Sequence, residues 1–92
     1  MSGTKAIEVQ VTGRVQGVSF RAWTQAEARG RGLAGWVRNE ADGAVRAHLE
    51  GAAGAVEAML AALHEGPPAA RVRAVTARDA APTGETAFEI RR

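Results

Sequence analysis

An arginine, an asparagine and a glycine-bracketed loop are the parts of this sequence that could do chemistry. The loop, residues 13–19, follows an alternating apolar stretch, and Arg21 stands where a helical pattern begins. Backbone N–H groups at such a loop and at a helix start attract anions, and the planar guanidinium adds a cation that binds oxyanions. Asn39 follows 18 residues after Arg21. We therefore expect Arg21 and Asn39 to be the catalytic residues of a site for a small tetrahedral anion.

The spacing of apolar residues predicts five strands and two helices that would position these residues. An Asp42-Gly43 pair marks a hairpin turn, and Gly66 with two prolines ends the second helix. The predicted order is a strand at 5–12, a helix at 19–29, strands at 34–40 and 45–50, a helix at 56–63, a strand at 71–78 and a short strand at 88–90.

This order predicts an α+β fold, the ferredoxin-like two-layer sandwich, with two helices on one face of an antiparallel sheet (βαββαβ plus a short extra strand). A right-handed crossover makes the first two strands parallel, so their C-terminal ends meet at one edge of the sheet. The loop, Arg21 and Asn39 should gather there. Strand alternation places Asn39 on the face of Val37, so Asn39 faces the helices if Val37 packs beneath them. We expect residues 1–92 to form a single domain.

Composition disfavours several classes of function. The absence of cysteine excludes a disulfide framework, a thiolate zinc site and a cysteine nucleophile. The first residues lack an apolar signal region, and no segment approaches the roughly 20 apolar residues of a membrane helix, so we expect a cytoplasmic protein without membrane contact. The net charge is only +2, and eleven of the twelve basic residues are arginines spread among the acidic ones. A nucleic-acid-binding protein usually clusters its basic residues on one face.

The expected site lacks groups for acid–base or metal chemistry. His48 and His64 lie outside the loop, and no Asp or Glu stands between Gly13 and Trp23. Such a site suits a reaction whose leaving group departs unprotonated, for example the carboxylate of a mixed carboxylic–phosphoric anhydride. Transfer of that phosphoryl group to water depends mainly on positioning and on stabilising charge on the equatorial oxygens.

Three longer strings of the chain form a recognisable pattern: VTGRVQGVSFR at 11–21, TQAEA at 24–28 and GLAGWVRN at 32–39. DGAV at 42–45 and GPPA at 66–69 extend the pattern over essentially the whole chain. With these strings the sequence resembles the acylphosphatases, small enzymes that hydrolyse the carboxyl–phosphate bond of acyl phosphates. The resemblance implies the ferredoxin-like fold and metal-independent hydrolysis, without a cofactor, by direct attack of water.

The resemblance also implies a role for each site residue. Arg21 would be the family's phosphate-binding arginine, and Asn39 the asparagine that positions the attacking water. Ser19 departs from the family pattern, in which glycine or a bulky aromatic residue is more common, and its hydroxyl becomes a candidate ligand contact. The substrate-binding cradle would be formed by the amides of six successive residues: Val15, Gln16, Gly17, Val18, Ser19 and Phe20.

Alternatives stay open at this point. A domain of this kind could bind phosphate or carbamoyl phosphate without turnover, as in the acylphosphatase-like domains of large hydrogenase-maturation carbamoyltransferases. Each residue taken without the rest of the motif has a plainer explanation: Arg21 could be a surface arginine, and Asn39 could be a turn residue. An RNA-recognition motif shares the topology but needs aromatic residues on the central strands, and the first and third strands here hold none.

We expect a monomer that binds a small-molecule acyl phosphate as substrate. Inorganic phosphate or other small anions would bind as product or competitive ligands, and nucleic acid would not bind. The sequence leaves open whether Arg91 and Arg92 approach the site.

Overall fold

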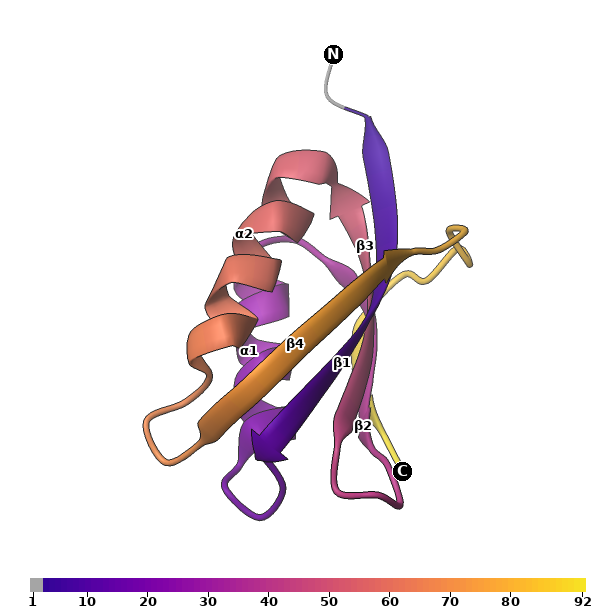
Figure 1. Ribbon diagram of the computed structural model, residues 1–92. Coiled ribbons are helices and arrows are strands. Elements are labelled where there is room, and N and C mark those ends of the chain that lie inside the picture. The colour runs from indigo at the N-terminus through magenta and orange to yellow at the C-terminus, as the bar shows by residue number, and fades with distance from the viewer. Residues whose placement is uncertain (1–2) are drawn as a thin grey trace.

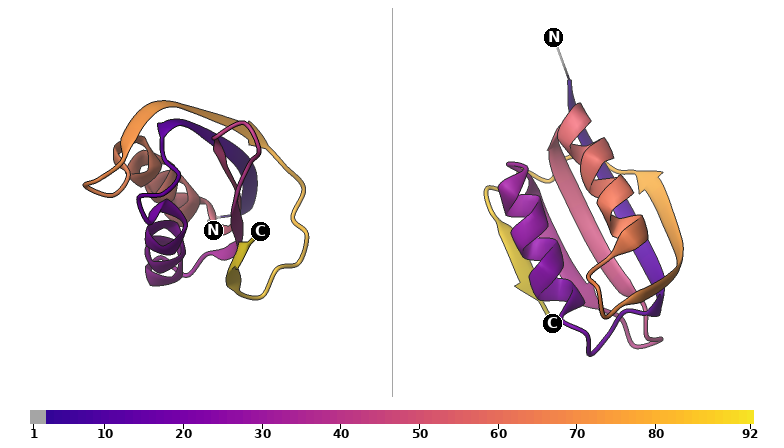
Figure 2. Two further views of the ribbon diagram at one scale, coloured as in Figure 1. Left: turned by 90° about the horizontal axis from the view of Figure 1, so that it is seen from below. Right: turned by 90° about the vertical axis from the view of Figure 1, so that its left-hand side faces the viewer.

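The computed structural model describes residues 3–92 and shows two helices packed on a five-stranded sheet (Figure 1). Residues 1 and 2 of the expected domain lie outside the described residues. Both helices cover the same face of the sheet (Figure 2), which confirms the ferredoxin-like α+β prediction. The elements are β1 (Thr4–Arg14), α1 (Phe20–Gly30), β2 (Ala34–Asn39), β3 (Val45–Ala52), α2 (Ala53–Glu65), β4 (Arg71–Asp79) and β5 (Phe88–Arg91).

The strands lie in the order β4-β1-β3-β2-β5. Since β3 pairs antiparallel with both β1 and β2, these two strands run parallel to each other, as predicted, and end at the same edge. The prediction of a wholly antiparallel sheet is wrong at the other side, where β5 pairs parallel with β2. The cause is the connection formed by residues 80–87. It leaves the C-terminal end of β4 and crosses the face of the sheet opposite the helices before it enters β5 (Figure 2).

The core lies between the helices and the sheet and follows the predicted alternation. Ile7, Val9 and Val11 of β1 are buried in it, and so is Val37 of β2. Each such side chain stabilises the fold by about 1.5–3 kcal/mol relative to an exposed one. Because Val37 packs beneath the helices, Asn39, which lies on the same face of β2, also faces the helices. No helix among residues 3–92 has the length and hydropathy of a membrane span.

The opposite face of the sheet carries a buried polar cluster that fastens the 80–87 connection. His48 and Glu50 of β3 are joined by a 2.8 Å contact between Nε2 and Oε1. The backbone N–H and the hydroxyl of Thr83 also donate to Oε1 of Glu50, at 3.1 and 2.9 Å. One carboxylate thus holds the segment that leads into β5.

This cluster makes the stability of the fold depend on pH. Burial alone would raise the pKa of Glu50, but hydrogen bonds from His48 and Thr83 outweigh it and leave that pKa below its ordinary value. A carboxyl group with a lower pKa in the folded state stabilises the fold above its ordinary pKa, and the contribution is lost as the pH falls through the folded-state value. We predict that Glu50→Gln flattens the fall in the free energy of unfolding as the pH drops below the ordinary pKa of a glutamate, measured by urea denaturation.

Glu89→Gln is the matched control because this β5 carboxylate is 60% exposed and lies 3.8 Å from its partner Arg91. Its pH dependence should follow the wild type. Equal slopes for Glu50→Gln and the wild type would contradict the role assigned to Glu50.

Candidate active site

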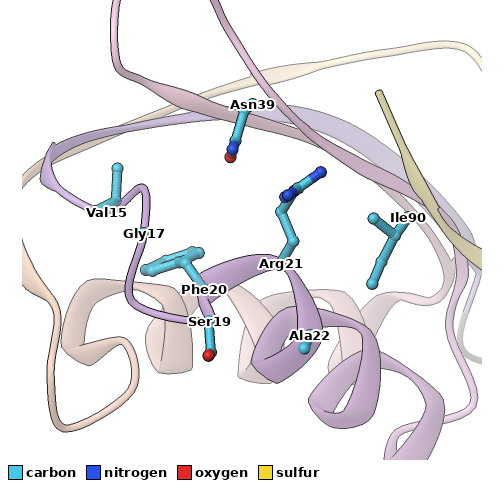
Figure 3. A pocket seen from close by; sticks show the side chains of 8 residues that line it. All are labelled: Val15, Gly17, Ser19, Phe20, Arg21, Ala22, Asn39 and Ile90. Carbon is cyan, nitrogen blue, oxygen red and sulfur yellow. The ribbon is translucent and has the colours of Figure 1, made fainter.

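The loop after β1, the start of α1 and the end of β2 meet at one edge of the sheet (Figure 1). A cavity of about 390 Å³ opens between them. Figure 3 shows side chains from the loop, α1, β2 and β5 around this space. The lining residues are Val15, Gly17, Ser19, Phe20, Arg21, Ala22, Asn39 and Ile90.

Two residues of the loop adopt the left-handed conformation that a tight turn requires. Gly17 has φ 75°, which glycine tolerates freely, and Ser19 has φ 63°. Ser19 is the sole non-glycine residue with positive φ in the described chain, at a cost of about 1–2 kcal/mol. Strain of this kind concentrates at functional sites, where the surrounding structure maintains it.

The loop begins at a position that admits no side chain. Gly13 lies at a register shift between β1 and β4, and a Cβ there would collide with the carbonyl oxygen of Arg71. This glycine therefore has a steric role in the sheet. It brings the chain out of β1 in the direction that the loop needs.

The backbone N–H groups of residues 15–19 have no hydrogen-bond acceptor within residues 3–92. Unpaired N–H groups in a turn with left-handed residues form an anion-binding concavity. The loop leads directly into the start of α1, whose first N–H groups are also free of helical partners. The cradle thus offers several donors to an oxyanion.

Arg21, the second residue of α1, adds positive charge to the cradle. The first turn of α1 holds no acidic residue, so nothing there offsets the positive end of the helix dipole. Within the described residues Arg21 joins none of the ion pairs. Its guanidinium lies at the centre of the cavity in Figure 3. An incoming anion therefore does not have to displace a carboxylate from Arg21.

Asn39, the last residue of β2, points its amide toward the space beside Arg21 (Figure 3). Its Oδ1 is buried and receives no hydrogen bond from residues 3–92. A buried amide oxygen without a donor costs about 1–3 kcal/mol, so a water molecule or a ligand is the expected partner. An amide in this position can orient a water molecule next to the bound anion.

Among residues 3–92, no carboxylate or imidazole lines the cavity. Glu40, which follows Asn39, is paired with Arg38 at 2.9 Å and with Arg46 at 3.2 Å. His48 belongs to the polar cluster on the far face of the sheet. His64 bonds to the carbonyl of Leu60 within α2. The cavity therefore contains a cation, amides and apolar groups, without a titratable acid or base.

Two residues of the predicted cradle do not line the cavity. The side chain of Gln16 turns away from it, and Nε2 donates to the carbonyl oxygens of Glu40 and Ala44 at 2.8 and 2.9 Å. Val18 packs against the hydrophobic core. Gln16 therefore connects the loop to the turn that follows Asn39. A ligand contact by the backbone amides of Gln16 and Val18 stays a prediction.

The cavity also has two lining residues that the sequence did not indicate, Ala22 and Ile90. Ile90 reaches the site because β5 pairs with β2 in a register that sets Ile90 beside Val37. The neighbouring Arg91 lies on the other face, with its guanidinium 5.5 Å from the centre of the Trp36 ring. Arg91 thus does not point into the cavity.

Known proteins resemble this chain in sequence and in fold. The family model for acylphosphatase matches residues 7–90. The chain belongs to the acylphosphatase family. An acylphosphatase from Nocardioides sp. is 52% identical over 86 residues, which cover 94% of this chain and 87% of the relative. The crystal structure of acylphosphatase from Bacillus subtilis matches with a TM-score of 0.93 at 35% identity, and the match covers 98% of this chain and 100% of that chain.

The acylphosphatase fold also occurs within longer proteins. The crystal structure of T. kodakarensis HypF matches with a TM-score of 0.84 at 30% identity. The match covers 96% of this chain but only 12% of the HypF chain. The same fold thus forms nearly all of a short acylphosphatase chain and only a small part of a long one.

We predict that Gln16→Met separates Asn39 from the loop. The loss of two hydrogen bonds should lower the free energy of unfolding by about 1–2 kcal/mol, measured by urea denaturation. Turnover should fall at least about tenfold because the water and the phosphoryl group lose their alignment. Gln25→Met is the control for kcat at saturating substrate, since Nε2 of Gln25 makes a comparable half-buried bond that goes to the carbonyl of Phe88 and not to the turn after Asn39. Equal losses of turnover in the two variants would contradict a specific role for Gln16.

We predict that the Ser19 hydroxyl is dispensable. It points away from Arg21 and Asn39 in Figure 3 and makes no capping hydrogen bond to α1. Ser19→Ala should change the inhibition constant of phosphate by less than about twofold. Ser19→Val should raise it about tenfold, because a β-branched residue resists the left-handed conformation. A large effect of Ser19→Ala would show that the hydroxyl binds the ligand.

Proposed function

We propose that this chain hydrolyses the carboxyl–phosphate anhydride bond of small acyl phosphates, giving a carboxylate and inorganic phosphate. Arg21, the amides of residues 15–20 and the start of α1 hold the phosphoryl group, and Asn39 orients the attacking water. The observation that carries the proposal is the meeting, in one cavity, of unpaired loop amides, an unpaired guanidinium and a buried amide oxygen without a donor.

The cradle and Arg21 act on the phosphoryl oxygens. In the transition state negative charge is spread over the three equatorial oxygens, and fixed donors stabilise it without reorganisation. The water oxygen forms a bond to phosphorus while the bond from phosphorus to the acyl oxygen breaks. The electron pair of that bond leaves with the carboxylate, and the water protons pass to phosphate oxygens or solvent.

The leaving group explains why the cavity needs no general acid. A carboxylate has an ordinary pKa near 4 and departs as an anion at neutral pH. An alkoxide leaving group would require a proton donor, and the cavity lining provides none. The proposed substrates are therefore acyl phosphates rather than phosphate esters.

We also propose that residues 1–92 act as one domain, as a cytoplasmic monomer without a metal, cofactor, membrane or nucleic-acid partner. One observation supports the monomer. The single exposed large hydrophobic side chain in residues 3–92 is Ile90, and it lines the cavity. Permanent interfaces usually bury larger apolar patches.

The second candidate is a domain that binds phosphate or carbamoyl phosphate with little turnover. It is kept because the same fold also forms a small part of the longer HypF chain. This candidate uses the same cradle and the same Arg21. It differs in giving Asn39 no catalytic role, which makes Asn39 the residue to test.

We predict rapid hydrolysis of benzoyl phosphate by the wild type in the presence of a chelator. Asn39→Ala should lower kcat about a hundredfold while the inhibition constant of phosphate stays within about threefold, because Asn39 orients water and does not bind phosphate. Arg21→Ala should lose both turnover and phosphate inhibition. Initial rates with and without added phosphate measure kcat and the inhibition constant of phosphate for each of the three proteins.

Arg29→Ala, which removes an exposed arginine from the other end of α1, is the matched control and should keep wild-type rates. Circular dichroism verifies that each variant is folded. Slow turnover by both the wild type and Asn39→Ala, with phosphate still binding, would favour the binding domain and contradict the hydrolase.

A further inference from the structure

Ile90 is an exposed apolar side chain between two charged neighbours in the sequence. It is 40% exposed and is the only exposed large hydrophobic residue in residues 3–92. On the same short strand, Glu89 is 60% and Arg91 44% exposed. Single surface hydrophobic residues are common and need no explanation by themselves. What distinguishes Ile90 is that its exposed surface lies in the cavity beside Arg21.

The cavity has two chemically different halves. Figure 3 shows Asn39 and the loop on one side of the Arg21 guanidinium and Ile90 on the other. The first half carries the unpaired amides and the amide of Asn39. The second half is bounded by Ile90, and among the lining residues of the cavity Arg21 is the one polar side chain beside it (Figure 3).

An acyl phosphate has two parts that match the two halves of the cavity. Its phosphoryl group is anionic, its acyl group is neutral and often apolar, and one bridging oxygen joins them. With the phosphoryl group in the cradle and the water beside Asn39, in-line attack directs the leaving acyl oxygen away from Asn39. In Figure 3 that direction leads past Arg21 toward Ile90.

Ile90 is also held firmly enough to discriminate between ligands. Phe88, two residues earlier, is buried in the core, and its carbonyl accepts a 3.1 Å hydrogen bond from Nε2 of Gln25. The N–H of Gly35 donates to the carbonyl of Ala87 at 2.9 Å. An apolar side chain fixed in this way gains affinity by covering apolar ligand surface without a large loss of its own freedom.

We propose that Ile90 is the residue that contacts the acyl group and sets the acyl preference. This inference rests on the proposed hydrolase function. It assigns to the enzyme a preference for acyl phosphates with a branched or aromatic acyl group over acetyl-sized ones. Inorganic phosphate, which has no acyl group, should not sense Ile90.

The test compares two substrates in Ile90→Ala and the wild type. The KM for benzoyl phosphate should rise about fivefold, the size expected when contact with one to two methylene equivalents is lost. The KM for acetyl phosphate and the inhibition constant of phosphate should change by less than about twofold. Ile90→Leu should restore the wild-type KM for benzoyl phosphate.

Two further measurements separate affinity from turnover and from general damage. The wild type should bind benzylphosphonate more tightly than methylphosphonate, and Ile90→Ala should reduce that ratio of inhibition constants toward one. Glu89→Ala, on the same strand but the opposite face, should leave all constants at their wild-type values.

A KM for benzoyl phosphate that stays unchanged in Ile90→Ala would overturn the inference. Equal rises for both substrates and for phosphate would also overturn it, because they would show a structural effect on the whole site. A wild type that hydrolyses neither substrate would overturn the proposed function itself. That outcome is distinct from an active enzyme with an unaltered acyl preference.

Discussion

The pairing of β3 with both β1 and β2 is the constraint on which the rest of this structure depends. Two antiparallel partners of one strand must run parallel to each other, so β1 and β2 end at the same edge. The chain that leaves β1 there forms the cradle, and the chain that arrives there through β2 delivers Asn39. Without this pairing the loop and Arg21, which we propose to bind the anion, would lie at the opposite end of the sheet from Asn39, which we propose to orient the water.

The site is locally unfavourable, and the surrounding fold maintains it. The loop has unpaired amides and a strained Ser19, and Asn39 has a buried oxygen without a donor. The double hydrogen bond from Gln16 to the turn after Asn39 counteracts this tendency to rearrange. The result is a preorganised site that stabilises charge but moves no proton, which limits it to substrates with good leaving groups.

The far face of the sheet contributes to the same site through β5. Glu50 holds Thr83, and the connection it fastens carries the chain across to the edge beside β2, where Ile90 enters the cavity. A cluster that looks purely structural thereby fixes the proposed acyl contact. The same connection therefore carries both the contacts of Glu50 and the strand with the proposed acyl contact.

Much of the architecture could be read from local patterns in the chain. The period-two spacing of Ile7, Val9 and Val11 and the shared face of Val37 and Asn39 are set by strand geometry, so the fold class and the side of the sheet on which Asn39 lies were predictable. The positions of Gln16, Ser19 and Ile90 were not. Gln16 turns to carbonyls 24 and 28 residues away, and Ile90 depends on a parallel pairing reached by an irregular connection. Such contacts leave no periodic signal in the sequence, because they join segments that are far apart along the chain and meet only when the protein folds. The sequence by itself determined the elements and the candidate reacting residues, and only the tertiary structure decided which side chains support them and which one we propose to meet the acyl group.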